Sequence, residues 1–222
     1  MKTSLIGIKS ILMVVLVLTF LIPINIFAES PFYIALKPGI YSPQSIDPEV
    51  LGEDVDLDFE TGFSGEIAFG CRFSPNVAAE LGIGYSNTDG EETFVAPPYV
   101  GRGEFNFDVY PVFFTLKPIL PYKKWEFFGL LGAGVYFVSG DFKANISGFP
   151  GTSHLEDHDA IFGVHLGAGI HYNITPKIFV GVEGKYLWTD EVKLKDKAYG
   201  IPLEAKFKMD GVIATAVFGI RF

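Results

Sequence analysis

The chain has 222 residues, enough for one substantial domain, and 49% of them are hydrophobic. Acidic side chains outnumber basic ones by 26 to 17, which argues against nucleic-acid binding because phosphates attract a basic surface. The single cysteine, Cys71, excludes an internal disulfide framework and a cysteine-based zinc site.

The N-terminal segment has the layout of a secretory signal peptide. Lys2 and Lys9 flank the start of an aliphatic run, and Ala28 supplies a small residue for cleavage. The run is shorter than the roughly 20 apolar residues that a spanning helix needs. We therefore expect a signal peptide over 1–28 and a mature domain over 29–222, in which 15 basic and 26 acidic side chains leave a charge of −11.

The mature sequence repeats an alternation of apolar with small or polar residues, about ten positions long, followed by a break. Period-two alternation predicts strands with two different faces. Short turns with Pro and Asn strictly alternate with long polar loops, which is typical of outer-membrane barrels. The expected strands cover 32–41, 59–73, 77–87, 104–117, 125–139, 159–173, 177–189 and 207–222. The expected long loops cover 42–58, 88–103, 140–158 and 190–206.

Bulky apolar side chains and glycines lie on opposite faces of these strands, as Leu166 and Gly167 illustrate. Because the lumen of eight strands is narrow, we expect the bulky face outside, in lipid, and the mixed face inside. The sequence predicts an all-β fold, an eight-stranded antiparallel transmembrane β-barrel with short periplasmic turns and long extracellular loops. Pro111 and Pro118 predict a bulge or irregular register in the fourth strand. Aromatic residues near strand ends are expected in interfacial girdles: Phe73, Tyr85, Tyr172 and Trp188.

The final strand ends in Phe222, with Ile220 and Phe218 two and four positions earlier. Together with the signal peptide and the sorted loops, this ending resembles the small outer-membrane barrel superfamily that includes OmpA-, OmpX- and OmpW-like proteins. The resemblance implies localisation in the outer membrane of a Gram-negative cell, with both termini periplasmic. It also implies that the barrel assembly machinery reads these three residues, and that membrane lipids and lipopolysaccharide surround the barrel.

Charged side chains on the mixed faces are expected to pair inside the lumen, since a buried charge is costly without a partner. Counting back from the turns sets Arg72 diagonally opposite Glu80. The same counting sets His165 opposite Lys185. Glu183 is expected diagonal to that histidine, and Lys37 is expected beside Glu66 at mid-membrane depth. The expected lumen set is Lys37, Glu66, Arg72, Glu80, Asp108, Glu126, His165, His171, Glu183, Lys185 and Arg221.

Two function classes stay open on this basis. The first is a structural or surface-interaction barrel whose lumen is plugged by salt bridges, and the second is a narrow passive channel favoured by the lumen glycines. A lipid A-modifying enzyme is disfavoured, because neither His154 nor His158 lies on an expected strand beside a catalytic serine. A soluble lipocalin-like binder ranks third. We expect no enzyme activity and no cofactor.

Acidic loops offer the weak candidates for metal binding. The run from His154 to Asp159 contains two histidines four apart, and it is interpreted as a solvated loop. The first long loop contains six carboxylates and no Lys or Arg. Carboxylate oxygens suit calcium or magnesium, so this loop is a candidate for bridging divalent cations to lipopolysaccharide phosphates. Its candidate ligands are Asp54, Asp56 and Asp58.

Overall fold

A computed structural model describes residues 31–44, 49–50, 53–54, 60–96, 99–146, 153–198 and 201–222. The strands are β1 (Phe32–Pro43), β2 (Glu49–Val50), β3 (Glu53–Asp54), β4 (Gly62–Ser74), β5 (Val77–Ala96), β6 (Tyr99–Tyr122), β7 (Trp125–Ile146), β8 (Ser153–Asn173), β9 (Ile178–Thr189), β10 (Glu191–Ala198), β11 (Ile201–Lys208) and β12 (Gly211–Arg221). The expected signal peptide lies outside the described residues. No helix in the described part of the chain is long and apolar enough to cross a membrane.

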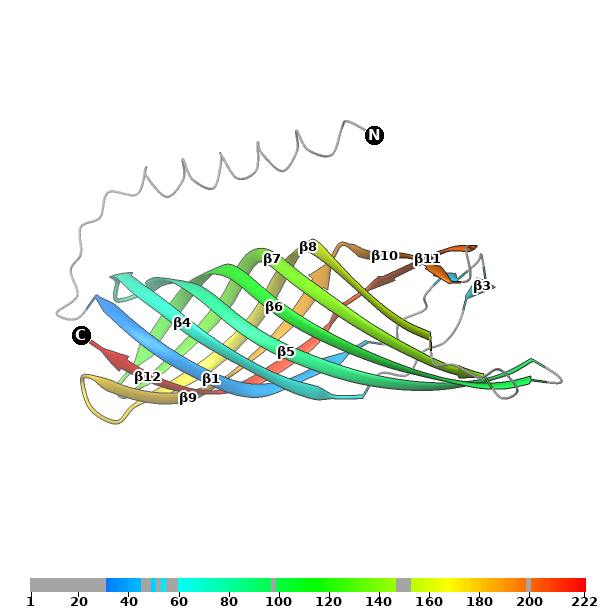
Figure 1. Ribbon diagram of the computed structural model, residues 1–222. Helices are drawn as coiled ribbons and strands as arrows, with labels where there is room; N and C mark the ends of the chain where they lie inside the picture. Colours follow the sequence, from blue (N-terminus) through cyan, green and yellow to red (C-terminus); the bar gives the residue numbers. More distant parts are fainter. Residues whose placement is uncertain are drawn as a thin grey trace, which may run out of the picture.

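Eight of the strands close into an antiparallel barrel in the order β1-β12-β9-β8-β7-β6-β5-β4 (Figure 1). The barrel closes where β1 pairs with both β12 and β4. The predicted all-β, eight-stranded architecture is confirmed. Three short turns link β4 to β5, β6 to β7 and β8 to β9 at one end, which we call the turn end. We call the opposite end the loop end.

Four strands are much longer than expected. β5 continues to Ala96 and β6 begins at Tyr99, while β7 continues to Ile146 and β8 begins at Ser153. Their ribbons run on past the ends of β1 and β4 in Figure 1. The prediction that these stretches are loops was wrong, because hairpin pairing continues without a register shift beyond the barrel wall.

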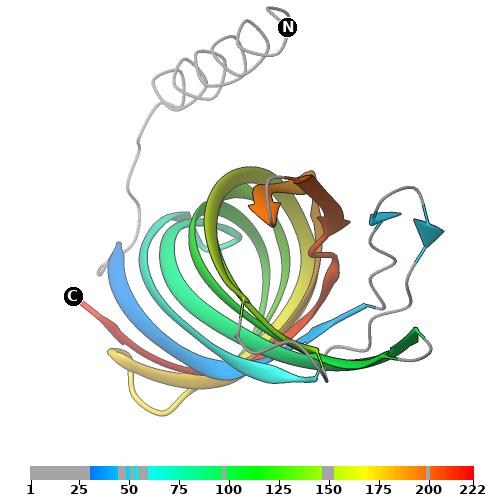
Figure 2. The same cartoon turned by 45° about the vertical axis from the view of Figure 1, so that its right-hand side comes forward.

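The fourth expected long loop also contains paired strands. β10 and β11 form a hairpin from Glu191 to Lys208, and β11 pairs briefly with β2, which pairs with β3. The β10–β11 hairpin stands at the loop-end opening of the barrel (Figure 2).

Along each barrel strand, buried and exposed side chains alternate. The exposed side chains are mostly apolar and many buried ones are charged, which is the reverse of a soluble protein. Large apolar side chains such as Ile34, Leu81 and Val182 lie on the outer wall with 44%, 54% and 56% of their surface exposed. Lys37 and Glu80 are 2% and 1% exposed, inside the lumen. Lipid is the solvent that matches such an outer wall, as the sequence predicted.

The prolines of β6 do not produce the expected bulge. The register with β5 keeps one offset on both sides of Pro111, and the register with β7 keeps one offset past Pro118. Each proline removes one backbone donor, but the flanking pairs hold the strand in place. Glycines leave room for the rings: a Cβ on Gly84 would lie 3.1 Å from Pro111, and one on Gly129 would lie 3.3 Å from Pro118. The observed irregularity lies instead between Arg72 and Ser74 in β4.

Candidate functional site

Four buried charges form a closed ring across the lumen. Lys37 Nζ on β1 lies 2.6 Å from Glu80 Oε2 on β5 and 3.0 Å from Glu183 Oε2 on β9. Lys117 Nζ on β6 lies 2.8 Å from Glu80 Oε1 and 2.7 Å from Glu183 Oε1. Every side chain in this four-charge ring is at most 3% exposed. Each charge has two opposite partners, which is the arrangement that offsets the cost of removing it from water.

Two more charges extend the ring without unbalancing it. Glu66 Oε1 lies 2.9 Å from Lys37 Nζ, and Glu66 Oε2 accepts a hydrogen bond of 2.8 Å from Lys185 Nζ. The hydroxyl of Tyr33 donates to Glu80 Oε1 at 2.8 Å. The extended network therefore contains three lysines and three glutamates, and its formal charge is zero.

A second cluster lies at the turn end and is slightly more exposed. Glu126 Oε1 accepts from Arg72 Nη1 at 2.8 Å, and Glu126 Oε2 accepts from Arg221 Nη2 at 3.0 Å. Asn173 bridges the cluster, donating to Glu126 at 3.2 Å and accepting from Arg221 at 2.7 Å. The charged side chains are 9–14% exposed, so this cluster forms the rim of the turn-end opening.

Aromatic rings cover the lumen glycines. A Cβ on Gly70 would lie 2.0 Å from the Tyr33 ring, so the ring rests directly on the glycine backbone. Lysine ammonium groups add to this filling: Lys117 Nζ lies 4.1 Å from the Phe128 ring centroid, and Lys185 Nζ lies 4.2 Å from that of Phe113. The space beside these glycines is therefore occupied by aromatic rings and is not an open channel. The further glycine–ring pairs are Gly219 with Phe179, Gly169 with Phe128 and Gly82 with Phe113.

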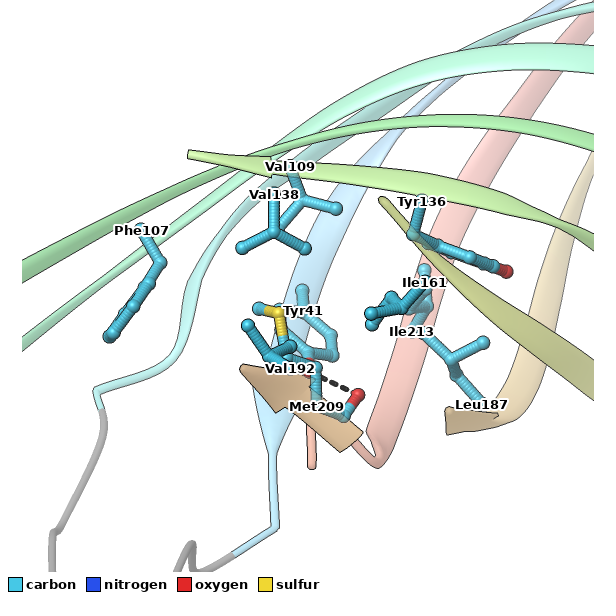
Figure 3. Close-up of a cluster of buried hydrophobic side chains, with 10 residues drawn as sticks. All are labelled: Tyr41, Phe107, Val109, Tyr136, Val138, Ile161, Leu187, Val192, Met209 and Ile213. Carbon is cyan, nitrogen blue, oxygen red and sulfur yellow. Dashed lines mark hydrogen bonds between the residues drawn. The ribbon is translucent and has the colours of Figure 1, made fainter. Parts of the chain in front are cut away.

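The loop-end half of the lumen is apolar (Figure 3). Its cluster consists of Tyr41, Phe107, Val109, Tyr136, Val138, Ile161, Leu187, Val192, Met209 and Ile213, all at most 8% exposed. Val192 belongs to β10, so the hairpin contributes a side chain to this cluster. A cavity of about 30 Å³ lies between the cluster and the charged network, with Glu66 and Lys185 among its lining residues, and it has room for about two water molecules.

Hydrogen bonds fix the base of the β10–β11 hairpin. Asp210 accepts from the backbone N–H of Thr189 at 2.7 Å, and the Thr189 hydroxyl accepts from the N–H of Met209 at 2.8 Å. Tyr41 donates to the carbonyl of Met209 at 2.7 Å, which joins the hairpin to β1.

The two lumen histidines contact a threonine and a glutamate. His165 Nε2 lies 2.9 Å from the hydroxyl of Thr115, and His171 Nε2 lies 3.4 Å from Glu183 Oε1. No cluster of three or more metal-ligating side chains occurs in the described part of the chain. Asp54 lies in β3, while Asp56 and Asp58 are outside the described residues. The run from His154 to Asp159, expected to be a loop, is part of β8.

The expected partnership between Arg72 and Glu80 was wrong. The two residues are diagonal across the β4–β5 register, but the guanidinium of Arg72 turns to the turn end and donates to the carbonyls of Ser74 and Pro75. Strands in a barrel are tilted and staggered, so distance from a turn is not depth. Glu80 consequently lies in the four-charge ring, not near the turn end.

The expected pairing of His165 with Lys185 was also wrong, by two residues. His165 is opposite Leu187, and Lys185 is opposite Gly167. The turn takes in Lys177, because the hydroxyl of Thr175 accepts from the backbone N–H groups of residues 177 and 178. Glu183 is opposite Gly169 and contacts His171, not His165.

Asp108 was wrongly assigned to the lumen. Its neighbours Phe107 and Val109 are buried inside, so Asp108 faces outward and accepts a 2.7 Å hydrogen bond from the Tyr85 hydroxyl. Inward-facing and outward-facing side chains alternate without interruption through Pro111, so Asp108 faces outward. The same alternation carries Lys117 inside.

Four residues of the lumen network were not among the predicted lumen residues: Lys117, Tyr33, Thr115 and Asn173. Lys117 stood at the predicted end of its strand, beside a proline expected to disturb the register. Extending the alternation from Phe113 would have placed it in the lumen. Tyr33, Thr115 and Asn173 are uncharged, so a search for buried charges passes over them.

The predicted girdle residues lie near both ends of the barrel. At the turn end the ring centroids of Tyr172 and Trp125 are 4.7 Å apart. At the loop end those of Trp188 and Tyr186 are 4.6 Å apart, and Tyr85 lies 5.4 Å from Tyr110. Phe73 is half-buried near the turn that follows β4. The outer wall carries the three terminal residues of the proposed assembly signal, Phe218, Ile220 and Phe222, with 54–59% of their surface exposed.

Comparison with known proteins gives the same architecture. The outer membrane protein OprG from Pseudomonas aeruginosa is 14% identical, with 87% of this chain and 96% of that chain covered and a TM-score of 0.60. A major outer membrane protein from Thermus thermophilus is 12% identical, with 88% and 100% covered and a TM-score of 0.56. These likenesses show the fold alone. No curated protein sequence matches the chain. The family model described as outer membrane protein beta-barrel domain matches residues 14–207, and the chain belongs to that family.

Proposed function

We propose that this protein is a non-conducting, non-enzymatic outer-membrane barrel. The barrel anchors strands and loops that are exposed at the cell surface. The observation that carries the proposal is the four-charge ring of Lys37, Glu80, Lys117 and Glu183, in which every charge is paired twice. A solute would have to break at least two buried ion pairs to pass, and each broken pair leaves two buried charges with one partner fewer.

In this proposal the turn end is periplasmic and the loop end extracellular, so both termini are periplasmic. The unequal ends support this orientation, because barrels of this class have short periplasmic turns and longer extracellular loops. The extended hairpins formed by β5 to β8 then present the surface for partners, among them lipopolysaccharide. The acidic first loop is a proposed site for weak divalent-cation bridging.

The outward-facing residues Phe218, Ile220 and Phe222 support recognition by the barrel assembly machinery. Phe218 and Ile220 on β12, and Phe222 directly after it, are exposed on the outer wall and take no part in filling the lumen. A β12 still unpaired with β1 would present them together with free backbone groups, which is what a strand-pairing partner requires.

A narrow passive channel is the second candidate. It is favoured by the cavity that Glu66 and Lys185 help to line, because this cavity is free space inside the lumen. Conductance of the refolded protein in planar bilayers separates the two. We expect no steady opening from the native chain. Large, steady openings of the native protein would overturn the proposal of a plugged lumen.

The matched variant is Glu80→Ala/Lys117→Ala, which removes one charge of each sign and leaves Lys37, Lys185, Glu66 and Glu183 balanced. We expect this variant to conduct, because the ring is opened and side-chain volume is lost. Lys208→Ala, outside the barrel lumen, is the control and is expected to stay closed. A Glu80→Ala/Lys117→Ala variant as silent as the native chain would show that the ring is not the barrier.

A further inference from the structure

The turn end carries an exposed group of lysines beside aromatic rings that the lumen does not use. The turn between β6 and β7 contains Lys123 and Lys124, and the turn between β8 and β9 contains Lys177. All three side chains are exposed. The two turns are neighbours, because the backbone N–H of Asn173 donates to the carbonyl of Lys124 at 2.8 Å.

Aromatic rings set the height of these lysines relative to the bilayer. Trp125 and Tyr172, with ring centroids 4.7 Å apart, lie on the outer wall directly next to the turns. Lys124 Nζ lies 6.0 Å from the Tyr172 centroid, and Lys123 Nζ lies 5.4 Å from the Tyr122 centroid. Tyr and Trp favour the headgroup level of a membrane, so ammonium groups beside them lie in the phosphate layer.

Nothing in these turns neutralises the lysines. Neither turn contains an acidic residue. The nearest carboxylate along the chain, Glu126, is only 7% exposed and is held by Arg72, Arg221 and Asn173. The three ammonium groups therefore form a cationic patch.

Backbone geometry also sets Lys123 apart. Its φ is 57°, and among the described non-glycine residues it alone has a positive φ. Turns of this kind favour glycine or asparagine at such a position, and a side chain there costs about 1 kcal/mol or more. A lysine in a position that suits glycine better indicates that the charge is used.

We propose that Lys123, Lys124 and Lys177, with Trp125 and Tyr172, form a binding site for an anionic phospholipid of the adjoining leaflet. The lysines contact the phosphodiester, and the rings contact the glycerol and upper acyl region. A phosphodiester without a cationic headgroup, such as phosphatidylglycerol, matches this patch better than a zwitterionic lipid, in which an ammonium group would meet the lysines.

Tryptophan quenching by brominated lipids tests this site directly, because the chain has two tryptophans and they lie at opposite ends of the barrel. Trp188→Phe leaves Trp125 as the reporter of the patch, and Trp125→Phe leaves Trp188 as the reporter of the loop end. Each tryptophan samples one leaflet whichever way the protein inserts. We expect Trp125 to show about a fivefold preference for brominated phosphatidylglycerol over brominated phosphatidylcholine, and Trp188 to show none.

Lys123→Gln/Lys124→Gln/Lys177→Gln in the Trp188→Phe background should lower the preference at Trp125 to about one. Lys208→Gln at the loop end should leave it unchanged. Lys123→Gly guards against a folding effect, because it relieves the backbone and should raise stability while still weakening lipid preference. No preference at Trp125, or one that survives the triple substitution, would overturn the proposal. Inorganic phosphate and chloride are compared at equal ionic strength. If phosphate lowers the lipid preference at Trp125 more than chloride does, the patch is a site for free phosphate instead.

Discussion

The two halves of the lumen are filled differently: the turn-end half combines a charged network with a small apolar cluster, whereas the loop-end half contains a larger apolar cluster. Toward the turn end, charges such as Lys117 and Glu80 are buried in pairs that depend on every partner. Toward the loop end, side chains such as Val138 and Leu187 pack without any charge. Apolar packing tolerates exchange of one residue for another of similar volume, whereas a charged network loses far more when one member is removed. The charged network therefore restricts which residues are permitted in the turn-end half, whereas the loop-end half restricts mainly their size.

The largest effect on stability is expected from Lys117→Met. This substitution leaves Glu80 and Glu183 with one lysine fewer and an unbalanced buried charge, so we expect a loss of about 3–5 kcal/mol in the free energy of unfolding. Urea unfolding in lipid vesicles, followed by tryptophan fluorescence, measures it. Lys117→Met/Glu80→Gln restores neutrality and should recover part of the loss. A single variant no less stable than the native chain would remove the contrast between the halves.

The matched change in the apolar half is Leu187→Ala. Its side chain is 4% exposed in the cluster, so the cavity should cost about 2–3 kcal/mol in the same unfolding assay. Leu187→Met keeps the volume and should cost less than about 1.5 kcal/mol. Equal losses from both variants would mean that shape, and not volume, governs this half.

Gly70→Ala tests the aromatic packing of the turn-end half. The added Cβ would meet the Tyr33 ring at 2.0 Å, and moving that ring also disturbs its hydrogen bond to Glu80. We expect a loss of about 1–2 kcal/mol. Gly184→Ala is the control, since no atom lies within 4 Å of its Cβ position. Thermal unfolding of the two variants side by side should rank Gly70→Ala clearly below Gly184→Ala.

The smallest effect is expected from Arg72→Gln at the rim. Glu126 keeps Arg221 and Asn173 as partners, and the side chain of Arg72 is 14% exposed, so water replaces part of the lost interaction. We expect a loss of about 1 kcal/mol in urea unfolding. A loss as large as that of Lys117→Met would show that the rim and the four-charge ring act as one unit.

Alternation and loop sorting were sufficient to predict the barrel, its eight strands and its outward apolar face. They located most of the lumen charges because Lys37, Glu66 and Glu183 lie in unbroken alternation. They predicted Lys37 beside Glu66, which is confirmed. They did not predict the pair of Glu80 with Lys37, because these residues lie on strands separated by β4 and meet through the stagger of the closed barrel. The faces of the fourth predicted strand were the least well determined: Asp108 was placed on the inner face, and Lys117, beside Pro118, was not assigned, whereas the inner face carries Phe107, Val109 and Lys117.

The long extensions of β5 to β8 were missed because their sequences are polar and rich in turn-forming residues. A strand outside the membrane needs no apolar face, and the paired backbone alone leaves no period in the hydrophobicity. The β10–β11 hairpin was missed for a different reason. β11 alternates Ile201, Leu203, Ala205 and Phe207 with Pro, Glu and Lys, a period-two pattern typical of a strand that was interpreted as part of a long loop.

The four-charge ring also bears on how the protein is assembled. Its members come from β1, β5, β6 and β9, so residues as far apart in the chain as Lys37 and Glu183 must meet before all four have both partners. While β1 and β12 remain unpaired, the lysines and glutamates stay accessible to water and oppose entry of the sheet into lipid. Closure removes that opposition in a single step. We therefore expect the ring to disfavour insertion of incomplete intermediates into lipid.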